Sequence, residues 1–107
     1  MIEKGLDLKA IQKMMEDRYR VNTDIYEYHN TFTGKDYYAL RFQCKSFAIF
    51  ISIRWSLSAK STQFISVNYE NLKTFQIRYS DWLFTKAGVI AELDKYLKPV
   101  TTQMSLF

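Results

Sequence analysis

The only histidine of the chain, His29, and two carboxylates that precede it are the residues best suited to acid–base or metal chemistry. Glu27 and His29 stand two residues apart in a stretch rich in β-branched and aromatic residues, so on a strand their side chains share one face. Such a pair could orient the imidazole or hold a metal ion weakly, with Asp24 nearby. A metal centre needs three or four ligands, and no others cluster here. We therefore expect His29 to be a solvated strand residue.

The single cysteine, Cys44, is the candidate nucleophilic thiol, but it falls on the predicted core face of its strand, where a buried and inert thiol is expected. Asp24, Gln43 and Lys45 resemble part of the acid and Glu/Gln-x-Lys pattern of metal-dependent nucleases, but the central acid of that pattern is missing. The three glycines form no phosphate-binding loop. The sequence therefore predicts a protein that is not an enzyme and that needs no metal or cofactor.

The composition is that of a single small globular domain. The 107 residues are 48% hydrophobic and 24% charged, with aromatic residues at 17%. One cysteine permits no intrachain disulfide, which favours a reducing cytoplasm. The N-terminal stretch is charged and lacks the apolar region of a signal peptide. The longest apolar run, 47–53, is too short to cross a bilayer as a helix, so no membrane partner is expected.

The positive charge of the chain is concentrated in its middle third. The net charge is +4, and the segment from Tyr37 to Tyr69 contains no Asp or Glu. The cations of that segment are Arg41, Lys45, Arg54 and Lys60. Such asymmetry favours an anionic partner for this region. The alternative is a sheet whose few charges happen to be basic.

Hydrophobic periodicity predicts an α+β fold. Residues 6–20 and 85–98 have the pattern of amphipathic helices, with Asp7 as N-cap of the first helix and Pro99 ending the second. Between them, alternating patterns predict strands at 21–32, 37–44, 46–55, 63–69 and 74–79, with a polar loop at 56–62 and an undecided stretch at 80–84. Short turns favour a meander-like antiparallel sheet of about five strands, with both helices on one face. We expect one domain over 1–99 and a flexible tail over 100–107.

Alternation along the predicted strands divides their side chains between two faces. The expected core face contains Tyr38, Leu40, Phe42 and Cys44, then Phe47, Ile49, Ile51, Ile53 and Trp55, then Ile65, Val67 and Tyr69, and last Phe75, Ile77 and Tyr79. The expected second face contains Tyr37, Ala39, Arg41 and Gln43, then Ala48, Phe50, Ser52 and Arg54, then Phe64, Ser66 and Asn68, and last Gln76 and Arg78. No acid appears among the second set.

Three arginines among aromatic rings make the second face a candidate nucleic-acid interface. Arg41, Arg54 and Arg78 could pair with phosphates, and rings such as Tyr37 could stack on the bases of a single strand. Lys45 and Lys60 would add charge beside this face. Arg and Tyr are also typical of protein interfaces, so a protein partner or plain solvent is the alternative.

The last five residues, Gln-Met-Ser-Leu-Phe at 103–107, resemble the bacterial sliding-clamp-binding peptide, whose usual form is Gln-Leu-(Ser/Asp)-Leu-Phe. The resemblance implies that Leu106 and Phe107 fill an apolar pocket of the clamp while Gln103 hydrogen-bonds at its edge. Met104 replaces the usual Leu, a conservative departure, and Ser105 matches the motif. Beyond Pro99, residues 100–107 can extend over roughly 26 Å. A chance match, with the two apolar residues folded back onto the domain, is the alternative.

Three functions remain open from the sequence. The first is an accessory protein of bacterial, phage or plasmid DNA replication or repair, docked on the sliding clamp and contacting DNA through the sheet. The second is a phage-encoded inhibitor or interaction module that binds a host protein and ignores DNA. The third is a structural subunit whose sheet face pairs in a homodimer.

Overall fold

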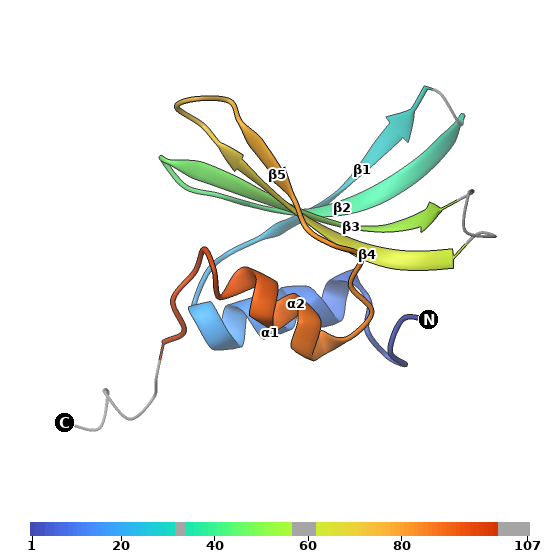
Figure 1. Cartoon of the computed structure of the whole chain (residues 1–107), viewed down its shortest axis with the longest axis horizontal. Helices are drawn as coiled ribbons and strands as arrows, with labels where there is room; N and C mark the ends of the chain where they lie inside the picture. Colours follow the sequence, from blue (N-terminus) through green and yellow to red (C-terminus); the bar gives the residue numbers. More distant parts are fainter. Residues whose placement is uncertain (32–33, 57–61, 101–107) are drawn as a thin grey trace.

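The computed structural model describes residues 1–31, 34–56 and 62–100, and it confirms an α+β chain with a five-stranded antiparallel meander (Figure 1). Its elements in chain order are α1 (Leu8–Tyr19), β1 (Asp24–Asn30), β2 (Lys35–Gln43), β3 (Phe47–Ser56), β4 (Thr62–Asn71), β5 (Ile77–Tyr79) and α2 (Lys86–Leu93). Residues 57–61 of the predicted loop and 101–107 of the predicted tail lie outside the described residues.

The strands lie in the sheet in the order of the chain, β1-β2-β3-β4-β5, and every neighbouring pair is antiparallel. The longest pairing joins β3 to β4, where Ile51 lies opposite Val67 and Ser52 opposite Ser66. β3 is rich in isoleucine, and β4 carries Ile65 and Val67 at its centre; these β-branched residues suit a pleated, buried surface. The middle of the sheet is therefore its most regular part.

Helix α1 begins where the sequence predicts. The Asp7 carboxylate accepts a hydrogen bond of 2.8 Å from the Ala10 backbone N–H, which satisfies one of the free donors of the first turn. The helix ends at Tyr19, and its C-cap residue Arg20 has a left-handed φ of 56° and donates its N–H to the Glu16 carbonyl. One face of α1 is buried, and it consists of Leu8, Ile11, Met14, Met15 and Tyr19, the stripe expected from helical spacing.

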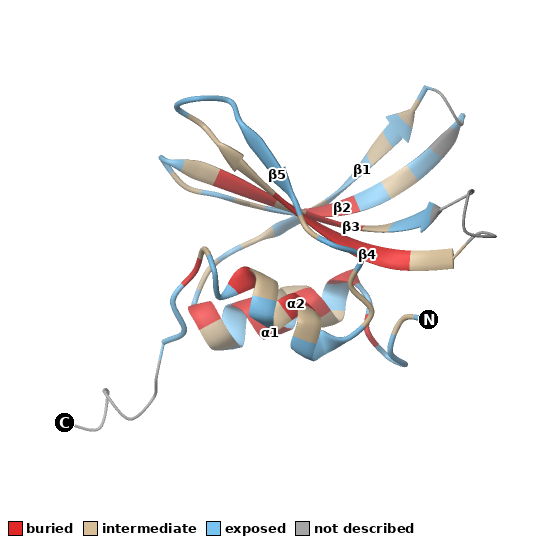
Figure 2. Ribbon diagram, in the orientation of Figure 1, coloured by how far each residue is buried: buried red, intermediate tan, exposed pale blue. Residues whose placement is uncertain are grey.

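Both helices lie on the same side of the sheet, below it in Figure 1. The buried side chains of α1 and α2 form one core with strand residues such as Leu40, Ile51 and Ile65, each 0% exposed. Figure 2 shows buried segments on both helices and in the middle of the sheet. The helices cover this face, and no helix or strand of residues 1–31, 34–56 and 62–100 covers the opposite face of the sheet.

Helix α2 is shorter than its pattern predicts. Thr85 caps it by accepting from the Gly88 N–H at 3.0 Å, and the helix ends at Leu93 rather than at residue 98. A turn then continues to Leu97, whose N–H donates to the Leu93 carbonyl at 2.9 Å. Leu93 and Leu97 are buried as expected, and Val89, 0% exposed, joins them in the core.

The C-terminal ends of the two helices are joined by a polar cluster. Arg18 donates to both oxygens of Asp94, from Nε at 3.1 Å and from Nη2 at 2.7 Å. The buried Tyr19 hydroxyl donates to Asp94 Oδ1 at 2.6 Å. Two carboxylate oxygens thus accept three charge-assisted or phenolic hydrogen bonds, which fixes α2 against α1.

Candidate interaction site

The structure places two of the three predicted arginines on the uncovered face of the sheet. Arg41 lies opposite Phe50, and Arg54 opposite Phe64, so all four residues belong to the same face. Arg78 does not join them: it lies opposite Tyr69, a residue packed against the core on the helix side. The prediction that Arg78 shares a face with Arg41 and Arg54 is therefore wrong.

The cause of this error is that the side chains of β5 alternate in the opposite sense to the predicted one. The predicted strand 74–79 begins only at Ile77, because residues 72–76 form a loop in which Phe75 has a left-handed φ of 62°. Ile77 and Tyr79, expected in the core, instead lie on the uncovered face and are 47% and 70% exposed. Phe75, also expected in the core, is 77% exposed.

Three other residues of the expected core face do not join the core. Tyr38 and Trp55 are more than half exposed. Trp55 is next to last in β3, and Tyr38 lies just outside the part of β2 that pairs with β3. Cys44 follows the last residue of β2 in the β2–β3 turn and is half-buried rather than enclosed. Its backbone N–H donates to the Phe47 carbonyl at 3.0 Å, which closes that turn.

The uncovered face also carries acids, contrary to the sequence expectation. Asp24 of β1 lies opposite Arg41, and its Oδ2 is 3.9 Å from Arg41 Nη2. Glu70 of β4 lies opposite Ala48, on the same face as Asn68. Two carboxylates therefore lie on the same face as Arg41 and Arg54, and the expectation that this face contains no acid is wrong.

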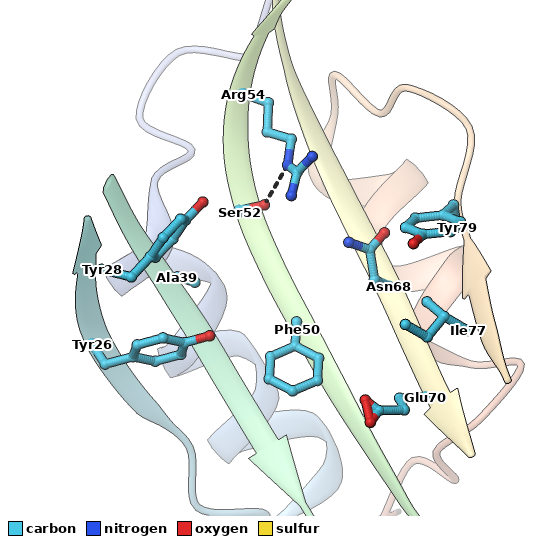
Figure 3. Close-up of a pocket in the computed structure, with 10 residues that line it drawn as sticks. All are labelled: Tyr26, Tyr28, Ala39, Phe50, Ser52, Arg54, Asn68, Glu70, Ile77 and Tyr79. Atoms are coloured by element: carbon cyan, nitrogen blue, oxygen red, sulfur yellow. Dashed lines mark hydrogen bonds between the residues drawn. The ribbon is translucent and has the colours of Figure 1, made fainter. Parts of the chain in front are cut away.

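A groove of about 410 Å³ crosses this face and receives residues from all five strands (Figure 3). Its lining consists of Tyr26, Tyr28, Ala39, Phe50, Ser52, Arg54, Asn68, Glu70, Ile77 and Tyr79. The hollow follows from side-chain size, because Ala39, Ser52 and Ser66 lie side by side in neighbouring strands. Large side chains on the edge strands rise on both sides of these small ones.

One wall of the groove is a row of aromatic rings at the β1 edge. The Tyr28 ring stacks on that of Tyr37 with centroids 5.8 Å apart, and Tyr26 lies 6.1 Å from Tyr28. The Arg41 guanidinium lies 5.8 Å from the Tyr26 ring centroid, at cation–π distance. These contacts hold the rings in place. The opposite wall, Ile77 and Tyr79 on β5, is the more exposed one.

Polar side chains determine the floor and the two ends of the groove. The Arg54 Nε donates to Ser52 Oγ at 3.2 Å, which lays the guanidinium along β3, as Figure 3 shows. In the floor, Ser66 Oγ donates to Asn68 Oδ1 at 2.8 Å, so the buried hydroxyl and the amide oxygen satisfy each other. Glu70 lies at the other end, and among the described residues neither Arg54 nor Glu70 forms an ion pair.

Two aromatic rings of the predicted nucleic-acid interface already stack on neighbouring rings of the protein. Phe64 is only 9% exposed, and its ring stacks on Trp82 with centroids 4.5 Å apart and planes 13° apart. Tyr37 stacks on Tyr28. The sequence missed Tyr26, Tyr28 and Tyr79 as site residues. Tyr26 and Tyr28 stand two residues apart in β1, so the sequence indicates that they share a face. The pairing of β1 with β2 then shows that this is the face of Ala39 and Tyr37.

The remaining predicted site residues lie elsewhere. Lys45 is exposed in the β2–β3 turn, and Lys60 lies outside the described residues. His29 is exposed and bonds Asp36 rather than Glu27, with Nδ1 2.8 Å from Oδ1 across the β1–β2 hairpin. Within residues 1–31, 34–56 and 62–100, no three His, Cys, Asp or Glu side chains are grouped as metal ligands. None of the helices described in this part of the chain has the length and apolar character needed to cross a membrane.

The five residues of the clamp-like motif, Gln103, Met104, Ser105, Leu106 and Phe107, lie outside the described part of the chain. The described chain ends at Val100, whose N–H donates to the Arg18 carbonyl at 2.8 Å. Comparison with protein-family models, with curated proteins and with solved structures finds no match to this chain.

Proposed function

We propose that this chain is a non-enzymatic accessory protein of DNA replication or repair in a bacterium, or in a phage or mobile element that lives in one, and that it docks on the sliding clamp. The observation that carries the proposal is the motif Gln-Met-Ser-Leu-Phe at 103–107. In this role Leu106 and Phe107 are paired apolar anchors, which suits a small hot spot on a partner surface. Clamp docking would take place in the cytoplasm.

The position of Val100 supports this proposal. Its bond to Arg18 holds it beside the end of α1, in the helix layer, and it is 50% exposed. The groove lies on the other face of the sheet. A motif that begins three residues beyond Val100 could therefore bind one partner while the groove stays accessible to another. Two modest contacts of this kind reinforce each other through raised local concentration.

DNA is the second partner that the sequence predicts, with single strands preferred. Exposed Arg41 and Arg54 and the tyrosine row of β1 support it. Asp24 and Glu70 on the same face, and the position of Arg78 on the helix side of the sheet, argue against DNA binding. The two acids on the groove face favour the second candidate function, an interaction module that binds a protein through its sheet and ignores DNA.

Clamp docking is tested by isothermal titration calorimetry of a purified bacterial sliding clamp with the intact chain and with variants. We expect Leu106→Ala combined with Phe107→Ala to abolish the binding heat. Met104→Leu, which restores the usual residue, should strengthen binding by a few fold. Thr101→Ala combined with Thr102→Ala, outside the motif, is the matched control and should bind as the intact chain does. Equal heats for the intact chain and for a chain lacking 103–107 would refute the proposal.

DNA binding is tested separately by fluorescence anisotropy with a labelled single-stranded oligonucleotide over a series of salt concentrations. Contact with phosphates predicts affinity that falls as salt rises, with a slope set by the number of contacts. Arg54→Ala should reduce both the affinity and the slope. Absence of binding at low salt would remove DNA as a partner and leave the interaction module.

A further inference from the structure

The groove has opposite charges at its two ends, and this polarity determines what it can bind. Ala48, the residue opposite Glu70, is six residues before Arg54 along β3. At the rise of a β-strand, Arg54 and Glu70 are therefore about 20 Å apart along the strand direction. Figure 3 shows the two side chains at opposite ends, with Phe50 and the rings of Tyr26, Tyr28 and Tyr79 between them.

A nucleic acid strand does not complement this pattern. Every nucleotide carries a phosphate, so a strand that lies along the groove would bring negative charge to the Glu70 end as well as to the Arg54 end. The other arginine of the face, Arg41, already has Asp24 beside it and lies over the Tyr26 ring. A ligand with one acid and one base separated by an apolar centre complements both ends.

We propose that the groove binds a short extended segment of a partner protein, with an aromatic or large apolar side chain in its centre, an acid over Arg54 and a base over Glu70. The length of about 20 Å between the two charges corresponds to about six extended residues. The centre of the groove suits such a side chain. Tyrosine walls give large contact area at low entropic cost, as they do in antibody paratopes.

The small residues of the floor explain how a side chain can enter. Ala39 and Ser52 lie beside each other beneath the aromatic walls, so neither fills the space above it. The Ser66 hydroxyl of the floor already donates to Asn68 Oδ1, so an apolar group placed over Ser66 leaves this donor paired. The exposed wall of Ile77 and Tyr79 would lose contact with water on binding. This proposal concerns the sheet and does not depend on clamp docking.

The test uses the full chain and three labelled seven-residue peptides, each with a central Trp. One peptide carries Asp and Lys at its ends, one carries Asp at both ends, and one carries Lys at both. We expect the intact chain to prefer the mixed peptide. Arg54→Glu should shift the preference to the peptide with two Lys, and Glu70→Lys to the one with two Asp. Each preference should be about three- to tenfold at low ionic strength and smaller in high salt.

Matched controls separate the groove from the net charge of the chain. Arg78→Glu and Glu27→Lys change the net charge by the same amounts on exposed residues outside the groove, and they should leave the preference for the mixed peptide unchanged. Tyr79→Ala should weaken binding of the mixed peptide by about tenfold, because it removes an exposed wall. Circular dichroism melting of each variant verifies that it is folded.

Three results would overturn the proposal. The first is that the intact chain binds none of the three peptides, and the second is that the groove variants show the same preference as the controls. The third is that a twelve-residue oligothymidylate binds more tightly than the mixed peptide and competes with it, which would assign the groove to nucleic acid. Clamp binding measured on the same variants distinguishes failure of this proposal from failure of clamp docking.

Discussion

Tyr19 donates a hydrogen bond of 2.6 Å from its phenol to Asp94 Oδ1, and so joins the last turn of α1 to the residue that follows α2. The Tyr19 side chain is buried, and the same carboxylate is also held by Arg18. This contact links segments 75 residues apart in the sequence. The stability of the helix layer should therefore respond to the ionisation of both groups.

Tyr19→Phe is expected to lower the free energy of unfolding by about 1 kcal/mol, because it removes one partner of a hydrogen bond while the aromatic ring remains in the core. Urea denaturation measures this change. Tyr79→Phe, at an exposed tyrosine, is the matched control and should change stability little. A Tyr19→Phe variant as stable as the intact chain would show that the contact contributes nothing measurable.

Alkaline pH should destabilise the protein through Tyr19. Burial, together with the hydrogen bond to Asp94, raises the pKa of Tyr19 to about 12 from 10.0. The folded chain thus holds the phenol proton more tightly than the unfolded chain does. This part of the stability is complete below pH 10 and is lost as the pH rises toward 12. Thermal melting across that window should show a steeper decline for the intact chain than for Tyr19→Phe.

Acid should destabilise the same cluster through Asp94. Its hydrogen bonds, first from Arg18 and then from Tyr19, hold the pKa of the Asp94 carboxyl below the ordinary value of 3.8. A lowered pKa contributes stability that is present above that ordinary value and is lost as the pH falls below it. Asp94→Asn should flatten the acid limb of a plot of stability against pH. Asp81→Asn, at an exposed residue, should leave that limb as it is.

The β4–β5 loop contains a residue under backbone strain. Phe75 has a φ of 62°, and its N–H donates to the Asn71 carbonyl at 2.8 Å. Asn71 Oδ1 also accepts from the N–H groups of Lys73 and Thr74, which fixes the loop. Because a left-handed residue with a Cβ costs about 1–2 kcal/mol, Phe75→Gly should be more stable than Phe75→Ala by about 1 kcal/mol. Urea denaturation of the two variants provides the comparison, and equal stability would argue against strain at this position.

The hydroxyl of Thr23, just before β1, is buried without a hydrogen-bond partner among the described residues. The backbone carbonyl of Thr23 is satisfied by Gln12 Nε2 at 3.0 Å, so the side chain alone is affected. Thr23→Val keeps the shape and removes the unpaired group, and it should raise the free energy of unfolding by up to about 1 kcal/mol. Thr23→Ser keeps the hydroxyl and should give no such gain. A destabilised Thr23→Val would imply that the hydroxyl does find a partner in solution.

The sequence predicts those parts of the fold that depend on strong local signals. The stripe of α1, its Asp7 cap and the existence of five strands follow from periodicity and from capping chemistry. The length of α2 does not, because the residues after Leu93 keep helical spacing while the backbone turns toward Leu97. A helix that continues to Leu97 and a helix that ends at Leu93 and is followed by a turn both place Leu93 and Leu97 in the core. The spacing of the apolar residues therefore does not distinguish these two backbones.

The candidate site is less predictable, because side-chain phase depends on where each strand begins. In β5 the loop ending at Gln76 shifts the alternation, which moves Arg78 to the helix side and Ile77 and Tyr79 to the groove. Alternation within β2 and β3 did place Arg41 and Arg54 on the uncovered face. The hollow itself depends on small residues from three strands lying in one row, which only the register reveals.

The order of the strands has a consequence for synthesis on the ribosome. Every strand pairs with its neighbours in the chain, so the meander can assemble step by step as the polypeptide emerges. The second half of its hydrophobic cover, from Val89 to Leu97, is translated after all five strands. Until then the nascent sheet presents Ile65 and Val67 to solvent. Chaperone binding to stalled chains should therefore end once α2 has left the exit tunnel.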